Sequence, residues 1–166
     1  MHSTILIRAA MVVTIALSTA GLAAAQSNAP TKLEGVINDY TDVTSASGPW
    51  HITGDWSAQL KGNSGKVDFV ASIAMIRSTS GGAPHTHHIG LTDGVVTVVP
   101  NGYRISGVAA ITSNGALAGF TGSQIDIELT GGTALPFSNM KVTFAGAGAI
   151  GHFGDLPLDG VVTLRQ

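Results

Sequence analysis

The sequence predicts an all-β fold, a single antiparallel β-barrel of about eight strands. Apolar and polar residues alternate with a period of two, and runs rich in Val, Ile and Thr are separated by turn signals that contain Gly. After Ala25 no segment keeps a helical apolar period for more than one turn. A closed barrel is favoured because closure removes the edges that such apolar strands would expose. A two-sheet β-sandwich is the alternative.

The N-terminal residues have the pattern of a secretory signal peptide. Arg8 precedes an apolar run over residues 9–24, and three alanines end at Ala25, where a signal peptidase would cut. The run is shorter than the roughly 20 residues that span a bilayer, and no basic flank follows it. We therefore expect a signal peptide over 1–25, a flexible segment over 26–31 and a barrel domain over 32–166. The mature protein would be secreted or periplasmic and free of the membrane.

The longest alternation predicts the first hairpin of the barrel. Even positions in residues 50–61 are apolar or small, odd positions are mostly polar, and Gly54 interrupts the apolar face. A glycine at such a place is typical of a sharp strand bend or a bulge. Residues 63–65 (Asn-Ser-Gly) then supply a turn before a second alternating run over residues 67–76.

The same pattern continues to the C-terminus. Strands are predicted over residues 95–99, 103–112, 124–130, 140–144 and 161–164. Turn signals stand at residues 81–82, 93–94, 101–102, 114–115, 131–132 and 159–160. Asp126 and Glu128 share one strand face opposite an apolar face, so we expect them on the solvated outside of the barrel, near Lys141.

Composition excludes several classes of protein. The chain has 166 residues with no cysteine, so it has no disulfide, thiolate metal ligand or cysteine nucleophile. A formal net charge of −2 excludes a strongly basic nucleic-acid binder. With 22 glycines, 44% apolar residues and only 11% charged residues, the composition is typical of one compact, turn-rich domain.

Large side chains on the predicted inner face are candidates for contact with a small hydrophobic molecule. These residues are Trp50, Trp56, Phe69, Met75 and Tyr103. The interior of an eight-stranded barrel is just wide enough for side chains or for one small ligand. Several inward candidates are small, as at Gly54 and Ala58, so both a filled interior and an apolar pocket are consistent with the sequence.

A histidine cluster is the one feature that points to metal chemistry. On a strand, His85 and His87 lie on one face about 6–7 Å apart, while His88 points to the other face. Two imidazoles in this arrangement can share one Zn²⁺ or Cu²⁺. Histidines without any ligand role are the alternative interpretation. The candidates for a third ligand are His51, His152, Asp93 and Asp55.

Five short segments carry a family resemblance: GDW at 54–56, GKVDF at 65–69, HTHH at 85–88, FSNM at 137–140 and GHFG at 151–154. On these segments the chain resembles a group of short secreted bacterial proteins of no known activity, whose architecture is similar to the allene oxide cyclase and dirigent barrels. The resemblance covers most of the mature chain. It implies an eight-stranded barrel that can hold a small apolar molecule, often in a homo-oligomer. It carries over no catalytic residue and implies no reaction.

Two functions from different classes follow from these patterns. The favoured one is a secreted barrel that binds a small hydrophobic molecule inside the barrel or at its mouth. The alternative is an enzyme of the cyclase, isomerase or hydrolase type, which would use a metal at His85 and His87, or a histidine as acid or base. No complete catalytic constellation can be assembled from the sequence, so whether the protein is an enzyme stays open.

Overall fold

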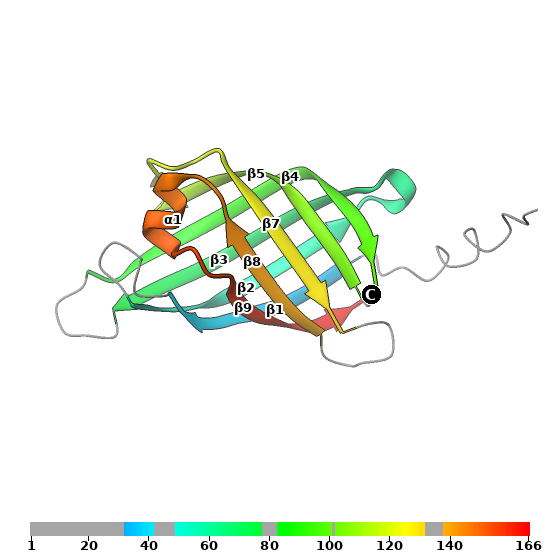
Figure 1. Ribbon diagram of the computed structural model, residues 1–166, viewed down its shortest axis with the longest axis horizontal. Coiled ribbons are helices and arrows are strands. Elements are labelled where there is room, and N and C mark those ends of the chain that lie inside the picture. Colours follow the sequence, from blue (N-terminus) through cyan, green and yellow to red (C-terminus); the bar gives the residue numbers. More distant parts are fainter. Residues whose placement is uncertain (1–31, 42–48, 78–82, 101, 132–137) are drawn as a thin grey trace, which may run out of the picture.

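The computed structural model describes residues 32–41, 49–77, 83–100, 102–131 and 138–166. Eight strands close into an antiparallel β-barrel, as the sequence predicts, and one short extra strand lies outside it (Figure 1). The predicted signal peptide and the segment over 26–31 lie outside the described residues. Within those residues no helix is long and apolar enough to cross a membrane.

Each strand of the barrel pairs with its neighbours in an antiparallel register. The barrel order is β1, β2, β3, β4, β5, β7, β8 and β9, and β9 closes the ring on β1. The bounds are β1 Lys32–Tyr40, β2 Trp50–Leu60, β3 Lys66–Arg77, β4 His85–Val99, β5 Gly102–Ser113, β7 Ser123–Thr130, β8 Ser138–Phe144 and β9 Leu158–Arg165. The extra strand, β6 (Ala116–Leu117), pairs only with the end of β5 among the described strands. A 3-10 turn, η3 (Gly62–Ser64), links β2 to β3.

The alternation along β2 and β3 places their apolar faces inside the barrel. Trp56 and Phe69 are 3% and 1% exposed, and their rings stack with centroids 6.0 Å apart. The β2–β3 ladder runs without a register shift through Gly54, so no bulge lies at this glycine. A Cβ at Gly54 would collide with the carbonyl oxygen of Ser72 on β3, which explains the glycine at this position.

Two turn signals in the sequence prove to lie inside strands. Asp93, expected in a turn, is part of β4 and has a positive φ of 55°. The β4 registers with β3 and β5 shift around this point, so the residue belongs to a β-bulge. Gly160 lies inside β9, where a Cβ would stand 2.6 Å from the carbonyl oxygen of Val36 and 2.8 Å from Met140 Cε. Close packing, and not a reversal of the chain, requires this glycine.

The outer face carries the predicted acidic residues. Arg104 on β5 makes two hydrogen bonds of 2.7 Å to the carboxylate of Asp126 on β7. Glu128 lies directly opposite Lys141 on β8, as expected. The end of the barrel next to η3 carries a second charged group, in which Lys61 contacts both Asp68 at 2.8 Å and Asp93 at 2.6 Å.

A short helix, α1 (Ala147–Phe153), connects β8 to β9 and was not predicted. Glycines with φ values of 100° and 93°, Gly146 and Gly154, flank it. Seven residues are too few to give a helical period that can be recognised in sequence. The helix lies at the end of the barrel where β4 begins (Figure 1). Its Phe153 is 1% exposed and stacks on Phe144 of β8 at 4.2 Å, so packing fixes α1 to the barrel.

Candidate metal centre

The first residues of β4 include two histidines on the inner face of the barrel. His85 and His87 lie opposite Met75 and Ile73 of β3, both of which are buried. Their imidazole centroids are 4.9 Å apart and the rings are nearly perpendicular, at 86°. The alternation of the strand sends His88 outward, where its Nδ1 lies 3.1 Å from the Ser72 hydroxyl. The predicted division between the inward pair and His88 is therefore confirmed.

Backbone carbonyls orient both inward rings. Nδ1 of His87 lies 2.8 Å from the Thr112 carbonyl oxygen, and Nδ1 of His85 lies 3.1 Å from the Ala83 carbonyl oxygen. A carbonyl only accepts, so Nδ1 is the nitrogen that carries the hydrogen toward the carbonyl in both rings. The Nε2 atom of each ring is then the one that can act as an acceptor or a metal ligand. The same arrangement, a ring N–H donated to a carbonyl with the other nitrogen free, orients histidines that bind metals.

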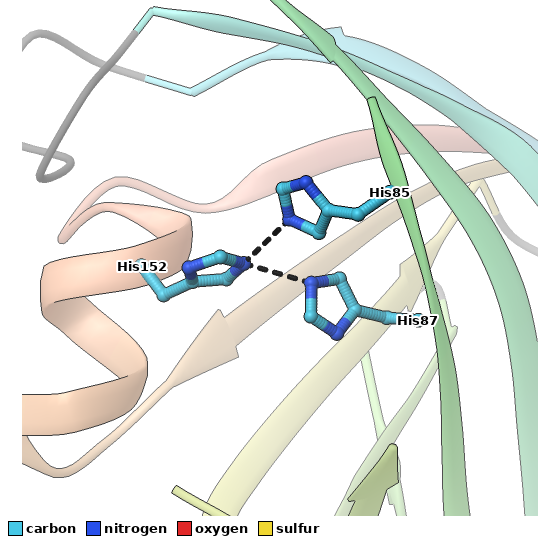
Figure 2. Close-up of side chains that lie close together, drawn as sticks. All are labelled: His85, His87 and His152. Carbon is cyan, nitrogen blue, oxygen red and sulfur yellow. Dashed lines mark hydrogen bonds between the residues drawn. The ribbon is translucent and has the colours of Figure 1, made fainter. Parts of the chain in front are cut away.

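The third histidine of the cluster, His152, lies on α1. His152 places its Nε2 2.7 Å from Nε2 of His87 and 3.1 Å from Nε2 of His85. Figure 2 shows the two β4 rings and the α1 ring pointing at one another, joined by these contacts. Of the four candidates for a third ligand, the structure brings His152 to the pair.

The spacing of the three rings fits a small metal ion. Their ligand nitrogens all lie within 4.8 Å of one another. Ligands at about 2.0 Å from a tetrahedral Zn²⁺ stand about 3.3 Å apart, so the observed spread brackets the required distance. Neutral His152 has at most one Nε2–H to share between two facing lone pairs. A cation at the centre would satisfy all three nitrogens at once.

Aromatic rings surround the cluster. Phe120 stacks on His152 with centroids 5.0 Å apart, and Trp50 meets the ring of His85 edge-on at 5.1 Å. Phe153 packs against His87 at 5.1 Å. His87 is only 2% exposed, whereas His85 and His152 are half-buried. The cluster is thus closed to solvent at His87 and partly exposed to solvent at the other two rings.

Burial makes two of the three rings poor bases. Burial, followed by the proximity of His87 and His85, lowers the pKa of His152 to about 4. Burial also lowers the pKa of His87, and the hydrogen bond to Thr112 partly opposes this effect. Both rings are therefore neutral at pH 7, the state in which an imidazole binds a metal. Among the described residues no carboxylate joins the group.

The other predicted candidates lie elsewhere. His51 points outward from β2, with its Nε2 2.7 Å from Asn38 Oδ1 and its ring stacked on Tyr40. Asp93 contacts Lys61 near η3, and Asp55 is exposed on the outer side of β2. The structure does not bring these three residues to the histidine cluster.

The residues predicted to contact a hydrophobic molecule lie inside the barrel. Trp50, Trp56, Phe69 and Met75 are buried, and Tyr103 is partly buried against the same core. Trp50 alone of these five has a ring contact with the cluster among those described. Each barrel strand contributes buried apolar side chains to one continuous core. Contact between the five residues and a ligand stays a prediction.

Sequence reasoning missed Phe120, which forms one wall of the cluster. It stands between β6 and β7 in a segment without regular alternation, so no pattern places it near the histidines. The position of Phe153 directly after His152 in the sequence is a weak indication that it lies near the cluster.

Comparison with models of protein families, with curated proteins and with solved structures finds no match for this chain.

Proposed function

We propose that this protein is a metal-binding barrel that holds Zn²⁺ or Cu²⁺ through Nε2 of His85, His87 and His152. One observation carries the proposal: three Nε2 atoms converge, and the carbonyl contacts at Nδ1 of His85 and His87 leave Nε2 as the ligand atom of both rings. Three imidazoles suit either ion, and both bind such ligands at about 2.0 Å. Harder ions such as Mg²⁺ and Ca²⁺ prefer oxygen ligands.

Three protein ligands support a reactive site better than a purely structural one. Structural zinc sites have four protein ligands, whereas catalytic sites keep a position for water or substrate. When bound, such a metal acts as a Lewis acid that polarises an oxygen ligand. The carbonyl of Thr112 orients the ring of His87, and Phe153 keeps water from its buried side. The half-buried rings of His85 and His152 leave access from the mouth.

A calorimetric titration with zinc and with copper at pH 7.5 tests the proposal. The mature wild type should bind one ion per chain. His85→Ala, His87→Ala and His152→Ala should each weaken binding at least tenfold, since the remaining ligands cannot replace the lost bond. His88→Ala and His51→Ala are matched controls, because both histidines lie on the outer face, and should bind as the wild type does. Equal weak binding by all six proteins would refute the metal site.

Binding of a small hydrophobic molecule is a second candidate, supported at the mouth of the barrel. Phe120 stacks on His152 and is only partly buried, whereas Trp50, which contacts His85, is 7% exposed. The interior offers weaker support, because buried side chains from all eight barrel strands pack there. Such a molecule would therefore lie next to the metal position, where it would also serve as the substrate of a metal-dependent enzyme.

A further inference from the structure

The charge of the cluster indicates what kind of ligand the open side would take. Three neutral imidazoles leave the double positive charge of a Zn²⁺ or Co²⁺ ion uncompensated. Among the described residues the group contains no Asp or Glu. An ionic charge in apolar surroundings is costly unless it is paired. An anion from outside the protein would supply the missing charge.

The burial of the three rings places that anion at the mouth. His87, at 2% exposure, forms the floor, so an incoming ligand must approach past His85 and His152. Phe120, which is also only partly buried, lies beside the cluster, with its ring centroid 5.0 Å from that of His152 and 6.0 Å from that of His87. Trp50, which is 7% exposed, lies edge-on to His85. An apolar body on the anion would therefore lie among aromatic rings.

We propose that the open position binds the carboxylate of a small organic acid whose aromatic body packs against Phe120. This inference rests on the proposed metal site and adds the chemical class of its ligand. The carboxylate oxygen provides the fourth bond and the balancing charge, while the aromatic body gains the apolar contact. Acids without an apolar body keep the first interaction and lose the second.

Cobalt-loaded protein provides the test, because the visible absorption of Co²⁺ reports on its ligands. The mature protein, loaded with Co²⁺ at pH 7.5, is titrated with phenylacetate, acetate and the uncharged phenylacetamide. Phenylacetate should change the spectrum with a dissociation constant at least tenfold below that of acetate. Phenylacetamide should leave the spectrum unchanged, because it lacks the anionic donor.

Variants of Phe120 distinguish the apolar contact with the ligand from the binding of the metal. Phe120→Ala should reduce the preference for phenylacetate over acetate to less than about threefold, and Phe120→Leu should keep part of it. Leu117→Ala, at a nearby residue that is 74% exposed, should keep the full preference. Cobalt affinity is measured first for each variant, so that lost metal is not mistaken for lost ligand contact.

The outcomes distinguish the two proposals. Absence of a cobalt spectrum together with absence of metal binding by calorimetry would overturn the metal site, and the organic-acid ligand with it. A normal cobalt spectrum that responds equally to acetate and phenylacetate, or to neither, would overturn the organic-acid ligand and leave the metal site intact. An equal response to phenylacetamide would also overturn it, because charge would then play no part.

Discussion

Acid should destabilise the metal-free protein through the histidine cluster. The fold holds His152 neutral, with a pKa of about 4, whereas an unfolded chain binds that proton at about pH 6.5. The unfolded state therefore binds more protons between these two values, and the stability of the fold decreases as pH falls. The contribution is complete above about pH 6.5 and is lost by about pH 4. His87, whose pKa is lowered as well, acts in the same direction.

The size of the effect follows from the separation of the two pKa values. At about 1.4 kcal/mol for each tenfold change in proton affinity, a separation from about 6.5 to about 4 corresponds to about 3.5 kcal/mol without solvent screening. His152 is only half-buried, and solvent screening reduces this figure to about 1–2 kcal/mol. That loss is a large fraction of the stability of a typical domain, about 5–15 kcal/mol.

Urea unfolding of metal-free protein measures this effect. The free energy of unfolding is compared at pH 7.5 and pH 4.5 for the wild type, His152→Gln and the control His88→Gln. The wild type should lose about 1 kcal/mol more than His152→Gln over this range, since glutamine does not titrate. His88→Gln should follow the wild type, and contributions from the carboxylates cancel in each difference. An identical loss in wild type and His152→Gln would refute the lowered pKa of His152 in the folded protein.

Three further results are expected. Trp56→Ala should reduce the free energy of unfolding by about 3–5 kcal/mol, because the indole is 3% exposed and stacks on Phe69; a loss under about 1 kcal/mol in a urea melt would contradict this packing. Gly54→Ala should destabilise by more than about 2 kcal/mol, since its Cβ would collide with β3. Gly90→Ala, whose Cβ would lie 4.0 Å from the nearest atom, is the matched control and should melt almost as the wild type does. Zinc affinity, measured by calorimetry from pH 7.5 to pH 4, should fall as protons displace the metal, with the loss below pH 6.5 because the pKa values of His87 and His152 are lowered; an affinity that stays constant down to pH 4 would contradict imidazole ligands.

Local patterns were sufficient to predict most of the barrel. A period of two depends only on neighbouring residues, so β2 and β3 are predicted within one or two residues of their bounds. Turn signals are less decisive, because a glycine can serve close packing as well as a turn. Gly160 is an example, since its role depends on Val36, far away in sequence. β1 was not predicted as a strand.

Only part of the candidate site comes from residues that are close in sequence. His85 and His87 are two residues apart on one strand, so their spacing alone predicts that they share a face. His152 reaches them through barrel closure and through α1, and neither feature is present in a local pattern. Four candidates for the third ligand therefore remained open in the sequence, and only the three-dimensional arrangement chooses among them.

The chain separation within the histidine cluster has a consequence for how the fold is held together. The two nitrogen contacts join α1 to β4 across 65 and 67 residues of chain, in a protein without cysteine. An ion held by both elements would act as a cross-link, and a disulfide closing a loop of that length stabilises by about 4 kcal/mol. Unlike a disulfide, a zinc cross-link would have no redox chemistry of its own and would open in the presence of a chelator. The metal would thus add to the packing of Phe153 in holding α1 to the barrel, and this added stability would depend on the supply of metal.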